Sequence, residues 1–287
     1  MTNPAARTRA NNTWIETPTL TIEAAGTTFA YRRLGRAQGV PVILLNHWGA
    51  NLDNFDPRIV DGLAQTCPVY ALDYRGVGSS GGEAPLTIGQ MADDIVAVIA
   101  SLGLDAVDLI GFSLGGFVAQ QITLSRPDLV RKLVLAGTGP AGGMGIERVG
   151  SVSWPLILKG LMTLKDPKTY LFFTSTANGR QAAEAFLLRL KERKTNRDAT
   201  VTPKVFLRQL KAITAWGRQP AQNLISIAKP VLVANGDHDI MVPSKNSTDM
   251  ARRIQGADLV LYPDAGHGGI FQYHEDFLRR TEVFLSA

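Results

Sequence analysis

The pentapeptide Gly-Phe-Ser-Leu-Gly at residues 111–115 is the most chemically suggestive pattern in the sequence, because it matches G-x-S-x-G. It lies where a predicted buried strand over 107–111 meets a helix predicted over 114–125. A sharp turn there would strain the backbone of Ser113, and side chains two residues before and after it would collide, which explains both glycines. The turn would also hold the hydroxyl at a helix N-terminus, whose dipole favours developing negative charge. We therefore predict that Ser113 is a nucleophile.

A serine hydroxyl needs a neighbouring base, which is itself oriented by an acid. Two later strand-end loops supply both, in the chain order serine, acid, histidine. A predicted strand over 230–234 leads to Asp237 and Asp239, and one over 258–261 leads to His267 between two glycines. His267 is the predicted base and Asp239 the preferred acid. Asp237 is the alternative acid, and its other role would be to tie the loop through backbone amides.

The remaining three histidines are set aside because of their positions in the chain. His47 ends an early strand and precedes the nucleophile. His238 lies inside the acid loop, too near to be oriented by it. His274 falls on the last predicted helix, where packing explains it.

The loop of residues 46–50, which leaves an early strand, is the candidate second half of an oxyanion site. Acyl transfer needs two N–H donors aimed where the tetrahedral oxygen develops. The backbone N–H of Leu114, directly after the nucleophile, would be one donor, and that of Trp48 would be the other. Trp48 could instead form only a wall of the pocket.

Strand and helix patterns alternate around these loops. Continuous apolar runs, typical of strands buried on both faces of a parallel sheet, occupy residues 41–47, 68–73, 107–111 and 132–136. Helical patterns lie between them, at 54–65, 87–102 and 114–125. Alternation of this kind predicts an α/β fold with a doubly wound, mostly parallel sheet.

The alternation stops at Gly137 and resumes at Lys229. The intervening residues are helical in character, with helices predicted over 180–194 and from Thr202, the second burying Phe206, Leu210, Ile213 and Trp216. We therefore predict a core domain of residues 14–140 and 221–287, a helical lid of residues 141–220, and a disordered tail of residues 1–13. Lid side chains that could line an apolar pocket are Trp154, Leu156, Leu158, Leu161, Met162, Tyr170, Phe172 and Phe173. Packing of the lid onto the core would explain most of them equally well.

Composition indicates a globular protein: 45% of the 287 residues are hydrophobic and 19% are charged. Apolar stretches fall far short of the roughly 20 residues that a spanning helix needs, and residues 1–15 hold no apolar signal region. The single cysteine, Cys67, excludes an intrachain disulfide and fits a cytoplasmic setting. Residues 145–220 carry 14 Lys and Arg against 5 Asp and Glu, a net +9, interpreted as a solvated helix face.

Other function classes find little support. Gly76 and Gly78 do not complete a dinucleotide motif, and no P-loop motif occurs. No histidine and carboxylate cluster indicates a metal, and the four tryptophans are too dispersed to form a platform for nucleic acid. We expect no cofactor, no metal, no nucleic acid and no membrane partner.

Together, residues 111–115, Asp239, His267 and the loop of residues 47–49 resemble the α/β-hydrolase superfamily, from Thr19 to the end of the chain. The resemblance implies an eight-stranded sheet and a serine hydrolase of the carboxylic-ester class. Residues 137–140 are similar to the lid entry of the cofactor-free haloperoxidase and perhydrolase subset. Dehalogenases and epoxide hydrolases of this fold carry aspartate where Ser113 stands, which argues against those two chemistries.

The leading hypothesis is hydrolysis of a carboxylic ester, thioester or lactone with a partly apolar small-molecule substrate, through an acyl-enzyme on Ser113. Amide or carbon–carbon substrates use the same machinery and stay open. Acyl transfer to peroxide or another acceptor is the enzymatic alternative, and a hydrolase-like ligand receptor with little turnover is the alternative of another class. The sequence does not give the physiological substrate or the oligomeric state.

Overall fold

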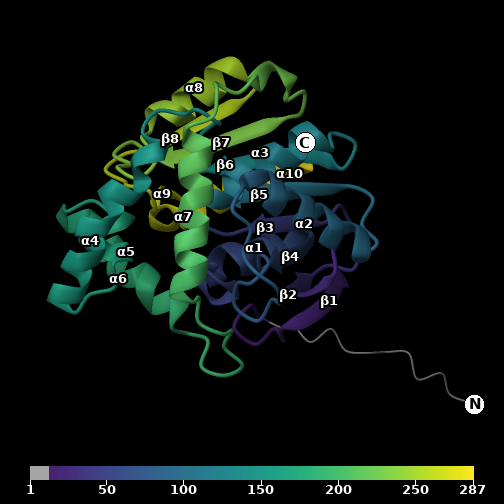
Figure 1. Cartoon of the computed structure of the whole chain (residues 1–287), viewed down its shortest axis with the longest axis horizontal. Coiled ribbons are helices and arrows are strands. Elements are labelled where there is room, and N and C mark those ends of the chain that lie inside the picture. The colour runs from purple at the N-terminus through teal and green to yellow at the C-terminus, as the bar shows by residue number, and fades with distance from the viewer. Residues whose placement is uncertain (1–12) are drawn as a thin grey trace, which may run out of the picture.

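An eight-stranded sheet forms the centre of the computed structural model, which describes residues 13–287 (Figure 1). The strands are β1 (Leu20–Ala24), β2 (Thr27–Gly35), β3 (Val42–Leu45), β4 (Pro68–Leu72), β5 (Val107–Phe112), β6 (Val130–Ala136), β7 (Val231–Gly236) and β8 (Asp258–Tyr262). Their order is β1-β2-β4-β3-β5-β6-β7-β8. The first three in this order pair antiparallel, and all later neighbours are parallel. The predicted fold class is confirmed, whereas the predicted tail falls almost wholly on residues 1–12, outside the described residues.

Helices cover both faces of the sheet. Those of the core are α1 (Pro57–Thr66), α2 (Ile88–Ser101), α3 (Leu114–Ser125), α8 (Lys245–Arg253), α9 (Gly269–Gln272) and α10 (His274–Ser286). The chain moves one way across the sheet from β3 to β4 and the other way from β4 through β5 to β8, so right-handed crossovers put α1 on the face opposite α2, α3 and α8. Consistently, α1 packs on α10, while α2 packs on α3.

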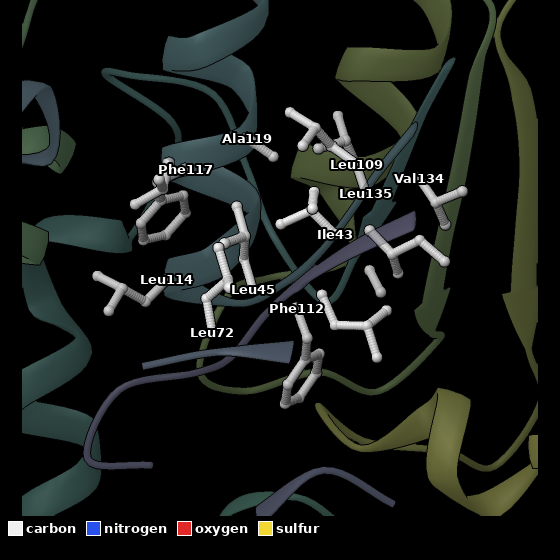
Figure 2. Packing of buried hydrophobic residues seen from close by; sticks show 14 of the residues in the cluster. Ile43, Leu45, Leu72, Leu109, Phe112, Leu114, Phe117, Ala119, Val134 and Leu135 are labelled. Carbon is white, nitrogen blue, oxygen red and sulfur yellow. The ribbon is translucent and has the colours of Figure 1, made fainter. Parts of the chain in front are cut away.

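The central strands are buried because nearly every residue in them is apolar. All residues of β3, β4 and β5 are buried. Figure 2 shows Leu45 of β3 near Leu114 of α3, and Leu109 of β5 beside Leu135 of β6. This packing fixes the position of each strand along its own axis. The register pairs Leu45 with Gly111 and Phe112 with Ala136. The loops after these strands consequently leave from one edge, which we call the carboxyl edge.

The segment between β6 and β7, which we call the helical insertion, holds helices and no strand over residues 137–230. Its helices are α4 (Val149–Thr163), α5 (Lys168–Leu171), α6 (Ala177–Leu190) and α7 (Pro203–Gly217). Thr202 caps α7 and proline opens it, as predicted. The buried face of α7 is, however, Val205, Gln209, Ala212, Ile213 and Trp216. The predicted core positions Phe206 and Leu210 are only half buried, because the helix turns them toward neighbouring elements of the insertion and the carboxyl edge.

Two predicted helices differ from the observed ones at their boundaries. Helix α1 begins at Pro57 rather than residue 54, because Asp56 accepts the Arg58 N–H and caps it. The final helix breaks at Tyr273 into α9 and α10. Among the helices of residues 13–287, none has the length and hydropathy needed to cross a bilayer.

Candidate active site

Ser113 occupies the turn between β5 and α3 in a strained conformation, with φ 56° and ψ −118°. A Cβ on Gly111 would lie 2.3 Å from the carbonyl oxygen of Gly115, and one on Gly115 would lie 2.0 Å from that of Leu45. Both glycines are therefore required by contact with backbone. The Thr138 hydroxyl donates to the Ser113 carbonyl at 2.9 Å and ties the turn to the end of β6.

Asp239 and His267 come together from the loops after β7 and β8. His267 Nδ1 lies 2.7 Å from Asp239 Oδ2, and both side chains are fully buried. The other carboxylate oxygen accepts the N–H groups of Met241 and Val242 at 2.8 and 3.0 Å, which holds Asp239 against rotation. Its two oxygens are thus committed to different partners.

Asp237, the alternative acid, lies elsewhere. Its side chain is about one-third exposed, its Oδ1 is 2.5 Å from His238 Nδ1, and the same oxygen accepts the Ala265 N–H at 3.3 Å. Asp237 therefore connects its own loop to the His267 loop through a backbone amide, the other role that the sequence suggests. His238 is exposed beside it.

Ser113 and His267 line one cavity. The Nε2 atom of His267 is buried and has no hydrogen-bond partner among the described residues, so its bond to the Ser113 hydroxyl is not formed in this structure. Such bonds are often long in a free enzyme and tighten when substrate binds. The structure thus joins the acid to the base, and the serine and the base line the same cavity without a hydrogen bond between them.

Two aromatic rings hold His267 in place. Its imidazole packs at 5.0 Å from the ring of Phe112 and 5.3 Å from that of Phe172. Gly268 donates to the Phe172 carbonyl at 2.7 Å, and a Cβ on Gly266 would lie 2.7 Å from the same oxygen. The flanking glycines therefore let the His267 loop approach the helical insertion closely.

The backbone N–H groups of Trp48 and Leu114 are available as donors. Leu114 is the first residue of α3, so its N–H has no acceptor within the helix. Trp48 N–H has no acceptor among residues 13–287.

Helix α7 fixes the Trp48 loop. The indole N–H of Trp48 donates to the Phe206 carbonyl at 2.7 Å, its ring stacks on that of Phe206 at 4.1 Å, and Gly49 N–H donates to Gln209 Oε1 at 2.9 Å. The Trp48 side chain also forms a cavity wall, the alternative role that the sequence suggested, while the oxyanion role of its N–H stays a prediction.

The cavity has a volume of about 180 Å³. Its lining residues are His47, Trp48, Gly49, Ser113, Ile157, Asp166, Pro167, Lys168, Leu171, Phe172, Phe206, Met241 and His267. Of the pocket residues expected from the insertion, only Phe172 is among them. Leu158, Leu161 and Met162 instead face solvent and are more than half exposed. The error has a simple cause: α4 turns the apolar stripe that contains them outward.

His47 is a lining residue that sequence reasoning set aside. Its Nδ1 lies 2.8 Å from the Trp48 carbonyl, while its buried Nε2 has no partner among the described residues. Burial lowers the pKa of His47 to about 3, and the nearby charge of Lys168 acts in the same direction. His47 is therefore neutral, with the proton on Nδ1 and a lone pair on Nε2. The sequence signal that could have placed His47 in the site was its position at the end of an early strand.

The chain is similar to known proteins in sequence and in fold. The sequence profile of a family described as alpha/beta hydrolase fold matches residues 40–272. A solved alpha/beta hydrolase fold protein from Chitinophaga pinensis superposes with a TM-score of 0.91 at 36% identity, covering 96% of this chain and 100% of that one.

Curated relatives carry names of hydrolases. A Rhizobium rhizogenes protein, provisionally named carbamate hydrolase RutD, is 27% identical over 269 residues, 90% of this chain and 97% of that protein. The pimeloyl-[acyl-carrier protein] methyl ester esterase of Nitrosomonas europaea is 26% identical over 249 residues, 84% of this chain and 93% of the esterase.

Proposed function

The chain belongs to the alpha/beta hydrolase fold family and is a hydrolase, and we propose that it cleaves carboxylic esters, thioesters or lactones through a triad of Ser113, His267 and Asp239. The observation that carries the proposal is the buried 2.7 Å contact between His267 Nδ1 and Asp239 Oδ2, beside a serine in a strained turn. The esterase among the relatives supports the ester class.

Asp239 sets the tautomer of His267. Because Asp239 Oδ2 accepts a hydrogen bond from Nδ1–H, the lone pair of the imidazole is on Nε2, on the side of the cavity. Nε2 takes the proton as the Ser113 oxygen attacks the substrate carbonyl. His267 then passes this proton to the departing alcohol or thiol, and the acyl group stays on Ser113. Water, deprotonated by His267, releases the acid and restores the serine.

The tetrahedral oxygen formed in each half-reaction is stabilised by the N–H groups of Leu114 and Trp48. Preorganised donors of this kind act on charge that is absent from the ground state, and losing one typically costs about 100- to 1,000-fold in kcat. The helix dipole of α3 favours the same negative charge. The hydrogen bond of Gly49 to Gln209 and the stacking of Trp48 on Phe206 hold the second donor in place.

The helical insertion acts as a lid in this proposal. Seven of the lining residues come from it: Ile157, Asp166, Pro167, Lys168, Leu171, Phe172 and Phe206. At about 180 Å³ the cavity is below the roughly 300–1,000 Å³ of typical small-molecule pockets. The substrate is consequently a small molecule whose apolar part contacts these side chains.

Hydrolysis of p-nitrophenyl acetate and butyrate by wild type, Ser113→Ala and Ser125→Ala tests the proposal. Ser125 ends α3 away from the cavity, so its variant should keep wild-type rates, whereas Ser113→Ala should lose about 10⁴-fold or more in kcat. A fluorophosphonate probe should label wild type but not Ser113→Ala. Activity that survives in Ser113→Ala would refute the proposal.

The same assay separates the alternatives. Faster product formation when hydrogen peroxide replaces water as acceptor would indicate perhydrolysis instead. Absence of both labelling and turnover would favour a receptor that binds ligand without cleaving it.

A further inference from the structure

Lys168 places a cation in the wall of the cavity. It is the first residue of α5, its side chain is about one-fifth exposed, and it is the only lysine or arginine among the lining residues. Most of the remaining wall is apolar, and Coulomb attraction is stronger there than in water. The proposed ester chemistry uses no cation at this place.

The pairing of Lys168 within the protein is loose. Its Nζ lies 3.4 and 3.5 Å from the two oxygens of Asp166, whose side chain is 38% exposed. Charge-assisted hydrogen bonds are normally about 2.7–2.9 Å long, and Arg189 of the same insertion reaches Asp56 at 2.7 Å. An ammonium group carries three donors. Lys168 therefore has donors to spare for an anion in the cavity.

The other basic group near Lys168 cannot take that anion. His47 also lines the cavity, but its Nδ1 is engaged with the Trp48 carbonyl, so its free Nε2 presents a lone pair. This atom would repel a carboxylate and accept a hydrogen bond from a hydroxyl or a water. Apart from the backbone N–H groups proposed for the oxyanion, the attraction for an anion within the cavity wall thus comes from Lys168.

We propose that Lys168 binds a carboxylate of the substrate, so that the preferred substrates are short esters or lactones that carry a carboxylate group. The inference rests on the proposed function and specifies its substrate class. A carboxylate fits better than a phosphate, because a dianion would meet the neighbouring carboxylate of Asp166. The net +9 of residues 145–220 would draw such substrates toward the site.

Two matched pairs of esters test this inference. One places the charge on the acyl side, with mono-p-nitrophenyl glutarate against p-nitrophenyl pentanoate. The other places it on the alcohol side, with 4-acetoxybenzoate against 4-methylphenyl acetate. The measured quantity is the ratio of kcat/KM for the anionic ester to that for its neutral partner. Because it is a ratio, a general loss of activity or of folded protein cancels.

In at least one pair, Lys168→Met should lower this ratio by about tenfold or more, the effect of one hydrogen bond to a charged group. Lys168→Arg should keep most of the preference, and Lys168→Glu should reverse it. Lys165→Met is the matched control, since it removes the same charge from an exposed residue outside the cavity wall and should leave the ratio within about twofold.

An unchanged ratio in Lys168→Met for both pairs would overturn the inference. An equal fall in Lys165→Met would do the same, since it would assign the preference to the general field of the insertion. Both outcomes are distinct from failure of the proposed function, in which no ester would show hydrolysis dependent on Ser113.

Discussion

The carboxyl edge of the sheet and the helical insertion contribute to the same cavity by different physical means. At the edge, Ser113 lies between Gly111 and Gly115, where an added Cβ would meet backbone atoms at 2.3 and 2.0 Å. Asp239 is held by two backbone amides at 2.8 and 3.0 Å and in turn holds His267. The insertion contributes mainly side chains such as Ile157 and Phe172, placed by the rotation of short helices. The edge therefore tolerates few substitutions, whereas the insertion can change the shape and charge of the cavity at small cost.

The largest expected effect separates two aspartates in one loop. In Asp239→Asn the amide oxygen would keep the Met241 and Val242 N–H groups, so the NH₂ group would face His267. Nδ1 would then have to accept, the proton would move to Nε2, and the base would be lost. We expect kcat for p-nitrophenyl acetate to fall about 10⁴-fold with the thermal midpoint little changed.

Asp237→Asn is the control for this substitution. Asp237 does not contact His267, so kcat should stay within about threefold of wild type. Equal losses in the two variants would mean that the loop as a whole, rather than the tautomer of His267, controls the reaction.

Two glycines provide the corresponding comparison for stability. In Gly115→Ala the new Cβ would meet the Leu45 carbonyl at 2.0 Å, and backbone cannot move aside cheaply. In Gly150→Ala of α4 the Cβ would meet only the side-chain end of Leu210, at 3.3 Å. We expect Gly115→Ala to lose at least about 3 kcal/mol, or roughly 10 °C in thermal midpoint.

Gly150→Ala should change stability by less than about 1 kcal/mol, since alanine favours the helix and Leu210 can shift. Calorimetry or thermal unfolding followed by circular dichroism measures both variants. A Gly150→Ala loss as large as that of Gly115→Ala would show that the insertion is packed as rigidly as the sheet edge.

This difference in packing also determines what the sequence could predict. The strands were evident from apolar runs. The sharp turn at Ser113 was evident from glycines at fixed spacing around it, because backbone sterics act over a few residues. The choice between Asp237 and Asp239 remained open, since it depends on the amides of Met241 and Val242.

The insertion was harder to predict than the edge. Helical periodicity located α6 and α7 but gave no rotation for the helices of the insertion. Leu161 of α4 was therefore offered for the pocket and is exposed, while Phe206 of α7 was expected in the core and lines the cavity. Lys168 was not singled out, because one lysine in a basic segment carries no local signal.

A smaller effect on kcat is expected where the helical insertion meets the carboxyl edge of the sheet. Gln209 of α7 accepts the Gly49 N–H at 2.9 Å, and its own NH₂ group has no partner among the described residues. Gln209→Met would leave the loop of Trp48 less firmly held, so we expect kcat to fall about tenfold with KM little changed. Lys211→Met, on the exposed side of α7, should keep wild-type kcat. A rise in KM at constant kcat would contradict a role in positioning the oxyanion donor.

The smallest effect is on stability, at a second contact between the helical insertion and the carboxyl edge of the sheet. Asp73, directly after β4, is buried beside Asp198 of the insertion, and both carboxyl groups approach Gly78. Burial raises the pKa of Asp73 well above its usual range, and the nearby carboxyl group of Asp198 raises it further. The folded state therefore holds a proton that the unfolded chain releases near pH 4. This contribution to stability is complete at lower pH and is lost as pH rises through the folded pKa.

Asp73→Asn replaces that proton with an amide hydrogen and removes this pH dependence. The thermal midpoint of the variant relative to wild type should rise between pH 4 and pH 8, by a few degrees. Asp105→Asn, on the surface, should show no such trend. A difference in thermal midpoint between Asp73→Asn and wild type that stays constant with pH would contradict this prediction. It would mean that Asp73 and Asp198 share no proton. The insertion would then be held to the sheet edge by packing and its other polar contacts.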